Sequence, residues 1–231
     1  MKKTLITLLA LGGLAMGETT LQDGLTFSTS TCTLPDGWTE VGASVTMVLD
    51  VEAFAQLFDT ATRSARPVFA SMVGNDNAIF GLEAHEENRI TGSYGVTAGG
   101  TYNNLYSLPN SDGDSIESIT WSNVKAAALT MSYTYANGTS WSLTVLDNAG
   151  NYTNLATPNT TLRNQNATDI ISFAVDTNVV TQAYAFDGFF RDDAAFALNQ
   201  QAIKAALVPE PTTATLSLLA LCGLAARRRR K

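Results

Sequence analysis

The chain has 231 residues, with 14 basic and 21 acidic side chains and a formal net charge of −7 at pH 7. Residues 1–17 and 208–231 hold seven of the basic residues and one acidic residue, so the body between them carries 7 basic and 20 acidic residues, a net charge of −13 with neutral histidine. Such a surface repels phosphate backbones and argues against a nucleic-acid partner. One histidine and one cysteine in that body cannot supply the ligands of a typical zinc site.

The first 17 residues have the pattern of a secretory signal peptide. Lys2 and Lys3 give a basic start, residues 5–14 are apolar, and residues 15–17 offer a small-x-small cleavage site. The apolar run is too short to cross a membrane well. We expect export and cleavage after Gly17, which leaves Glu18 as the new terminus.

Residues 18–207 read as a series of β-strands. Apolar and polar residues alternate with period two over 45–51 and 79–85, which predicts half-buried strands. Further strands are expected at 152–156, 170–175 and 184–191, separated by turn-rich breaks. Because strands do not alternate with helices, a parallel α/β sheet is disfavoured.

The strongest local pattern predicts a hairpin. Apolar and hydroxyl residues alternate over 129–135 and again over 140–145, on both sides of Asn137-Gly138. An Asn-Gly pair favours the positive φ angles of a tight hairpin turn.

A short helix is expected at the end of the body. Asn199 can cap a helix over 200–207, in which Ile203 and Leu207 lie four residues apart on one face. It is the one exception to the all-β pattern.

A family resemblance covers most of the body. Residues 186–199 hold a strand with a glycine, the acidic pair Asp192 and Asp193, and a further apolar stretch before the short helix. Together with the hairpin and the segment 121–124, these residues resemble the end of a concanavalin A-like, laminin-G-type jelly roll. The resemblance implies an all-β fold for residues 18–207, an antiparallel β-sandwich with a short C-terminal helix.

The last 24 residues form a three-part signal. Pro209, Glu210 and Pro211 form a rigid, extended box, residues 212–226 are apolar and uncharged, and residues 227–231 are all basic. The order resembles the PEP-CTERM sorting signal of Gram-negative bacteria. It implies cleavage by an exosortase-type enzyme, transient inner-membrane association through 212–226, and delivery to the cell surface or the extracellular polysaccharide matrix.

Candidates for catalysis are few. His85 lies in the acidic stretch 83–87 with neither a Gly-x-Ser-x-Gly motif nor a second metal-binding histidine, and we predict a solvated strand end and turn there. Asp50 and Glu52 have the spacing of two carboxylates on one strand face, but Val48 stands where related glucanases carry a catalytic Glu. We predict a protein without catalytic residues, and a secreted glycan hydrolase of the concanavalin A-like class is the alternative.

Candidate ligand contacts follow Gly99 and Gly100. Tyrosine rings flanked by side-chain amides suit a glycan, and the segment provides Tyr102, Asn103, Asn104 and Tyr106. A simple loop anchor would show the same residues. Trp121 and Trp141 have apolar neighbours and are predicted in the core.

No cofactor is expected, although calcium is a candidate ion. Loop carboxylates and amides could hold it, namely Asp147, Asn148 and Asn151, or Asp192 and Asp193. Ordinary turn chemistry explains the same residues, so no metal ligands are assigned. Cys32 is predicted to be half-buried and without an internal disulfide partner, since Cys222 lies in the sorting tail. We expect a non-catalytic, lectin-like module that binds a glycan or another surface protein.

Overall fold

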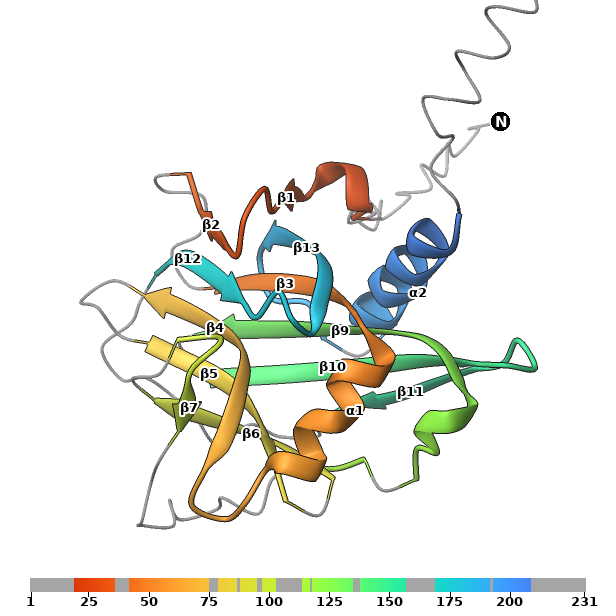
Figure 1. Cartoon of the computed structure of the whole chain (residues 1–231). Coiled ribbons are helices and arrows are strands. Elements are labelled where there is room, and N and C mark those ends of the chain that lie inside the picture. The colour runs from red at the N-terminus through yellow and green to blue at the C-terminus, as the bar shows by residue number, and fades with distance from the viewer. Residues whose placement is uncertain are drawn as a thin grey trace, which may run out of the picture.

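The computed structural model describes residues 19–35, 42–74, 79–86, 88–94, 97–102, 114–116, 118–134, 138–156, 169–191 and 193–208. The described chain forms two antiparallel sheets packed face to face, with two α-helices against them (Figure 1). The predicted signal peptide, residues 1–17, and the predicted tail from Pro209 onward lie outside the described residues. Among the described residues, no helix is both long and apolar enough to span a membrane.

Sheet A has six strands and sheet B has seven. The order in sheet A is β1 (Leu25–Thr26), β13 (Val180–Asp187), β3 (Gly42–Leu49), β9 (Val124–Thr134), β10 (Gly138–Asp147) and β11 (Tyr152–Ala156). The order in sheet B is β2 (Thr31–Thr33), β12 (Ile170–Val175), β4 (Arg66–Gly74), β5 (Ile79–His85), β6 (Arg89–Tyr94) and β8 (Asp114–Ser115), while β7 (Thr101–Tyr102) pairs with β4.

The connections between the sheets are those of a jelly roll. Strand β3 lies beside β13 in sheet A. The strand after β3, which is β4, lies beside the strand before β13, which is β12, in sheet B. Two antiparallel strand pairs therefore wrap together around one core, as in jelly rolls. The predicted fold class, an antiparallel β-sandwich with a C-terminal helix, is confirmed.

Most of the predicted strands are also confirmed. The structure has β5, β11 and β12 at the predicted residues. Strands β9 and β10 pair from Thr134 and Gly138 to Ala126 and Leu146, after which the register shifts. Strand β13 runs earlier than predicted, from Val180 to Asp187, because Gly188 at φ 94° turns the chain away from the sheet.

The core lies between the sheets and is built from alternate residues of each strand. Met47 of β3 and Leu129 of β9 face Phe80 and Leu82 of β5, and all four are almost completely buried. Each such side chain removed from water contributes roughly 1.5–3 kcal/mol. The core is thus fixed by period-two patterning in both sheets.

Helix α1 (Val51–Thr60) was not expected. We predicted a strand through Val51, but β3 ends at Leu49 and Asp50 caps the helix, its Oδ1 accepting a hydrogen bond from the Ala53 amide at 3.0 Å. Phe54 and Phe58, one turn apart, point into the core, and the helix contacts strands of both sheets. The helix therefore closes one side of the sandwich.

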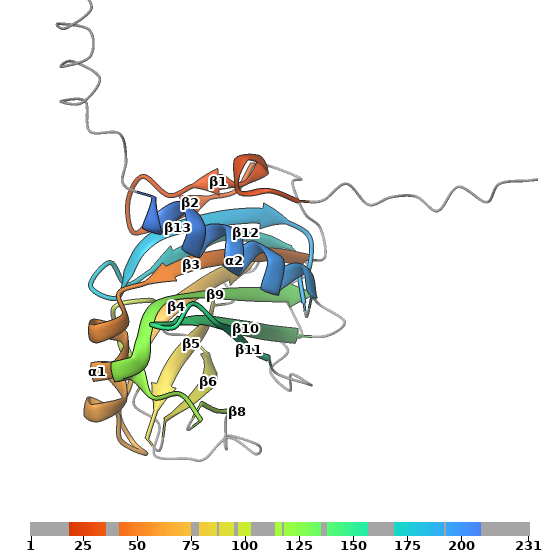
Figure 2. The same ribbon diagram turned by 90° about the vertical axis from the view of Figure 1, so that its right-hand side faces the viewer.

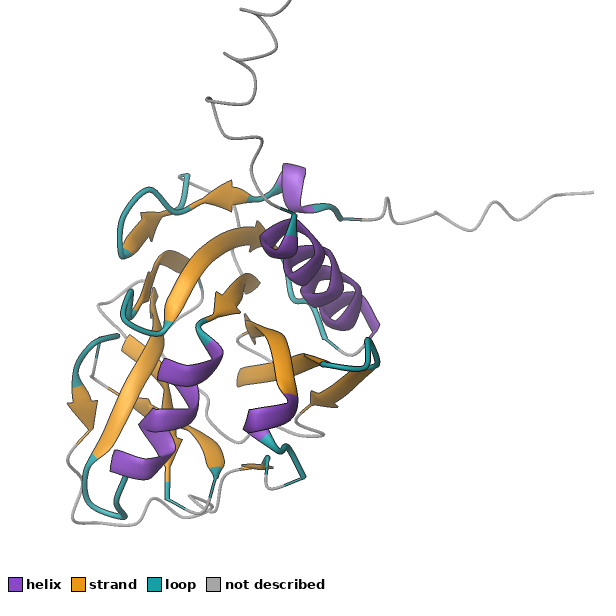
Figure 3. Cartoon of the chain, turned by 45° about the vertical axis from the view of Figure 1, so that its right-hand side comes forward, coloured by secondary structure: helices purple, strands orange, loops and turns teal. Residues whose placement is uncertain are grey.

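Helix α2 (Asp193–Leu207) lies across β3, β9 and β10 on the outer face of sheet A (Figure 2). It starts before Asn199, so the predicted cap is wrong, and Asn199 is a fully buried residue in the middle of the helix. Alanine-rich sequence after Asp193 allows the helix to begin earlier. The two α-helices occupy different sides of the strands (Figure 3).

Candidate functional site

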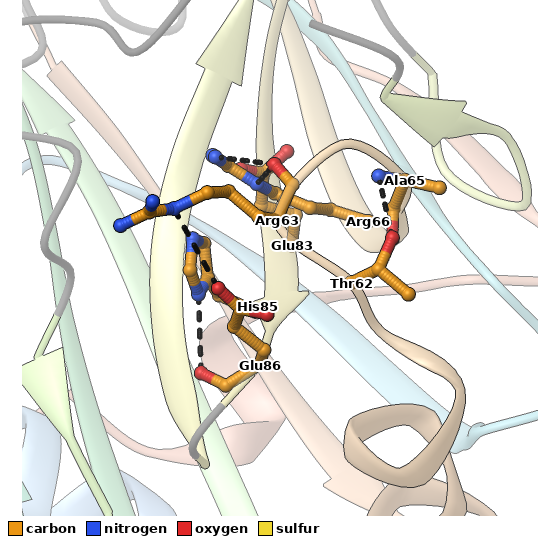
Figure 4. A network of polar contacts seen from close by, with 7 residues as sticks. All are labelled: Thr62, Arg63, Ala65, Arg66, Glu83, His85 and Glu86. Carbon is orange, nitrogen blue, oxygen red and sulfur yellow. Dashed lines mark hydrogen bonds and ion pairs between the residues drawn. The ribbon is translucent and has the colours of Figure 1, made fainter. Parts of the chain in front are cut away.

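A buried charged network lies on the outer face of sheet B, where β4 begins and β5 ends (Figure 4). In β5, Phe80, Leu82 and Ala84 point into the core, so the alternation places Glu83 and His85 on the opposite face. Both of these polar side chains are nevertheless buried. A covered charge on the outside of a sandwich requires a specific partner.

Arg66 is the partner of Glu83. Its Nη1 donates to Glu83 Oε1 at 2.8 Å, and the two side chains are 5% and 0% exposed. The same guanidinium donates from Nε and Nη2 to the Arg63 carbonyl oxygen at 3.2 and 3.0 Å. Charge-assisted hydrogen bonds of this kind are stronger than neutral ones, and the planar guanidinium can make several at once.

The Arg63 carbonyl belongs to a tight turn between α1 and β4. Thr62 and Ala65 close this turn, since the Thr62 amide donates to the Ala65 carbonyl at 2.8 Å and the Ala65 amide donates to Thr62 Oγ1 at 3.0 Å. The Arg63 side chain points outward, 83% exposed, and its Nε lies 3.7 Å from Glu86 Oε1. An exposed pair of this type contributes little to stability.

His85 corrects the sequence prediction. We predicted a solvated strand end at 83–87, yet Glu83 is fully buried and His85 is 6% exposed. His85 Nδ1 lies 3.1 Å from the Glu86 carbonyl oxygen. The prediction failed because Glu83 is paired with Arg66, a residue 17 positions earlier, and a local pattern does not show such a partner.

The segment Thr97–Tyr102 lies along the first half of β4. The Ala98 amide donates to Ser71 Oγ at 3.0 Å, the Gly99 amide donates to the Val68 carbonyl at 2.9 Å, and the Val68 amide donates to the Gly100 carbonyl at 3.0 Å. Gly99 has φ 80°, a conformation that glycine adopts without strain. The segment then enters β7, where Tyr102 pairs with Arg66.

The predicted ligand segment therefore starts beside the ion pair. The backbone of Tyr102 is in register with Arg66, although the Tyr102 side chain is not described. Asn103, Asn104 and Tyr106 lie outside the described residues, as do Pro209, Glu210 and Pro211 of the predicted sorting motif.

The carboxylates considered for hydrolysis do not share a strand face. Asp50 caps α1, and Glu52 lies in its first turn, with Oε1 3.4 Å from Gln56 Nε2. A retaining glycosidase needs two carboxyls about 5 Å apart on either side of a sugar bond. Asp50 is occupied by the helix cap, so this pair lacks that arrangement.

The loop proposed for calcium forms a self-contained turn. Asp147 Oδ1 accepts from the amides of Ala149 and Asn151 at 2.9 and 2.8 Å, and Oδ2 accepts from Asn151 Nδ2 at 3.0 Å. These hydrogen bonds, chiefly those from Asn151, hold the pKa of Asp147 below its ordinary value. Asp192 is outside the described residues and Asp193 begins α2; among the described residues, no three acidic, histidine or cysteine side chains gather as metal ligands would.

Two further predictions concern single side chains. Trp141 is buried as predicted, and Trp121 is partly buried and packs on the core, its ring stacked against Phe58. Cys32 is half-buried in β2, and burial raises the pKa of its thiol.

Sequence reasoning missed the Arg66–Glu83 pair. The available signals were a glutamate between Leu82 and Ala84 in an alternating strand, and an arginine that begins the apolar run 66–74. Neither signal identifies its partner, because the two residues come together only through strand pairing.

Comparisons with known proteins find distant similarity. No family model matches the sequence, and no curated protein matches it. The chain is similar to the LG1-3 region of the laminin alpha2 chain, with 13% identity and a TM-score of 0.30 over 68% of this chain and 28% of that one. It is also similar to the binding domain of botulinum neurotoxin serotype G, with 10% identity and a TM-score of 0.32 over 83% of this chain and 48% of that one.

A third solved structure, a protein of unknown function from Shewanella oneidensis, is 11% identical with a TM-score of 0.24 over 70% of this chain and 76% of that one. The chain spans less than half the length of the first two proteins. The fold assignment rests on the layers and strand order of the chain itself.

Proposed function

We propose that this chain is an exported bacterial surface or matrix protein whose β-sandwich is a non-catalytic, lectin-like module that binds a glycan or another surface protein. The observation that supports a binding role over hydrolysis is the state of Glu83. It is the only carboxylate in β4, β5 and β6, and it is fully buried and paired with Arg66. A carboxylate in this state has no second carboxylate beside it on those strands and no exposure to a sugar, so it suits a structural role.

Export and sorting are proposed from the two terminal segments. The basic and apolar start, followed by small residues at 15–17, supports secretion. The Pro209, Glu210 and Pro211 box with its apolar run and basic end supports processing by an exosortase-type enzyme, after transient membrane association through 212–226. The proposed destination is the cell surface or the extracellular polysaccharide matrix of a Gram-negative bacterium.

Binding is tested with the full chain in detergent micelles on immobilised dextran, xylan, alginate and chitin, beside a reducing-sugar assay on the same polysaccharides. We expect retention on at least one polysaccharide without sugar release. Retention only by surface proteins of the producing cell would favour the protein ligand. Sugar release that disappears in Asp50→Asn or Glu52→Gln would instead support the hydrolase.

Sorting is tested in the producing cell. Removal of residues 208–231 should abolish delivery to the surface, and replacement of Pro209, Glu210 and Pro211 by alanine should leave the chain in the membrane because the apolar run and basic end remain. Unchanged surface delivery of both variants would refute the sorting proposal.

A further inference from the structure

We propose that the buried Arg66–Glu83 ion pair is a positioning device, which holds the segment Thr97–Tyr102 in place through β4 and β7. The inference rests on the proposed function in that Tyr102, at the end of this segment, is the first of the predicted ligand contacts. It assigns a role to two residues that do not themselves meet a ligand.

The first step is the connection made by one guanidinium. Arg66 donates to the Glu83 carboxylate on β5 and twice to the Arg63 carbonyl in the turn after α1 (Figure 4). The first residue of β4 is therefore fixed both to the neighbouring strand and to the chain that leads into it. The Thr62–Ala65 bridge closes the same turn from its other side.

The second step is that β7 depends on the same part of β4. Strand β7 has only two residues, which pair with Arg66 and Pro67. The preceding hydrogen bonds join Gly99 and Gly100 to Val68, two residues after Arg66. A two-residue strand has little stability of its own, so its position follows that of its partner.

The third step concerns the type of interaction. Removing two charges from water is costly, and apolar side chains of similar size often stabilise a buried site equally well or better. Stability alone therefore gives a weak reason for an ion pair here. The pair does what apolar side chains cannot, since only the guanidinium can donate to the Arg63 carbonyl.

These steps lead to an experiment that separates positioning from stability. In the double variant Arg66→Met with Glu83→Met, apolar side chains replace both charges. Amide hydrogen exchange is measured in the full chain in detergent micelles, at Ala98, Gly99, Gly100 and Tyr102 and, as an internal reference, in the paired strands β9 and β10. Urea unfolding gives the global stability of the same samples.

We expect a urea midpoint close to that of the unchanged chain, with exchange at residues 98–102 faster by about tenfold or more, as when a local hydrogen-bonded unit opens more easily. Exchange in β9 and β10 should not change. The matched control is Arg63→Gln, which removes the exposed pair with Glu86 and should leave residues 98–102 protected. Unchanged protection in the double variant, or equal loss of protection in Arg63→Gln, would overturn the inference.

A second variant tests the inference if the double variant does not fold. Arg66→Lys keeps a positive charge opposite Glu83 but lacks the planar fork, so it should also expose residues 98–102 to faster exchange. Full protection in a folded Arg66→Lys chain would contradict the positioning role.

Binding to the same polysaccharides completes the test. Weaker retention in the double variant, at unchanged urea midpoint, supports both proposals. If the unchanged chain binds none of the polysaccharides while residues 98–102 lose protection in the variant, the proposed glycan binding fails and the positioning role remains.

Discussion

Thr130 donates a hydrogen bond from its hydroxyl to Asn199 Oδ1 at 2.8 Å, joining β9 to α2 where both side chains are buried. The Thr130 hydroxyl also lies 2.7 Å from Thr46 Oγ1, and Asn199 Nδ2 donates to the Ser142 carbonyl at 2.8 Å. One amide side chain thus links the helix to the central strands of sheet A. The interface therefore combines the hydrogen bonds of Asn199 with apolar contacts made by Ala202 and Ile203.

Replacing Asn199 by alanine should destabilise the fold by about 2 kcal/mol, because buried groups lose their partners. Urea unfolding followed by circular dichroism measures the change. Lys204→Ala, at an exposed site on the same helix, should change stability by less than about 0.5 kcal/mol. Equal effects of the two substitutions would show that the Asn199 hydrogen bonds contribute little.

Phe54 should be among the most costly positions to truncate. It is completely buried, and its ring meets Phe58, Phe69 and Trp121 edge to face at centroid distances of 5.3, 5.0 and 5.6 Å. Phe54→Ala should lower the free energy of unfolding by about 3–5 kcal/mol through lost burial and a cavity. Gln56→Ala, exposed on the same helix, is the control, and a loss below 1 kcal/mol for Phe54→Ala, on the order of a surface effect, would contradict the packing.

Asp147 should give a pH-dependent contribution to stability. Hydrogen bonds from Asn151 lower its pKa from the ordinary value of 3.8 in the folded state. The contribution is therefore present above pH 3.8 and is lost as the pH falls through the lower, folded-state pKa. Urea midpoints of the unchanged chain and Asp147→Asn should differ at neutral pH, approach each other as the pH falls below 3.8, and converge below the folded-state pKa.

The control for this titration is Asn148→Ala, because Asn148 contacts Asn123 rather than the carboxylate. Its effect on the urea midpoint should be the same at both pH values. A difference between the unchanged chain and Asp147→Asn that persists at low pH would rule out the carboxylate as its source.

Cys32 should react slowly with thiol reagents while the protein is folded. Burial raises the pKa of the thiol, which reduces the thiolate fraction that reacts at neutral pH. The rate of reaction with a disulfide reagent is measured in a Cys222→Ser background, first without and then with urea. Equal reaction rates in the folded and the unfolded protein would show that burial neither blocks access to the thiol nor raises its pKa.

Local patterns could be predicted from the sequence, and long-range pairings could not. The β9–β10 hairpin is visible in the sequence because alternating residues stand on both sides of Asn137-Gly138, although Gly138 itself begins β10. Helix α1 was missed because Val51 continues the alternation of β3, although Asp50 is a good capping residue. The role of Asn199 was also predicted wrongly, because asparagine is favourable both as a helix cap and at a buried position where its amide can form hydrogen bonds.

The Arg66–Glu83 pair shows more clearly why long-range contacts could not be predicted from the sequence. Arg66 and Glu83 are 17 residues apart, and a register shift between Val68 and Ala70 helps to set how β4 and β5 align. A shift of one residue would send Glu83 to the other face of the sheet. Such a register depends on the whole sandwich, so no short pattern could reveal the pair.

The place of β3 in sheet A has a consequence for how the chain is made. Its two neighbours, β9 and β13, begin at Val124 and Val180, so both follow β3 at long range in the sequence. Until those residues have been synthesised, β3 presents two open edges and no partner, a state prone to pairing with other chains. Folding is therefore expected to be late and slow. A chain that stays unfolded until its last strand has been synthesised can still pass through a narrow export channel.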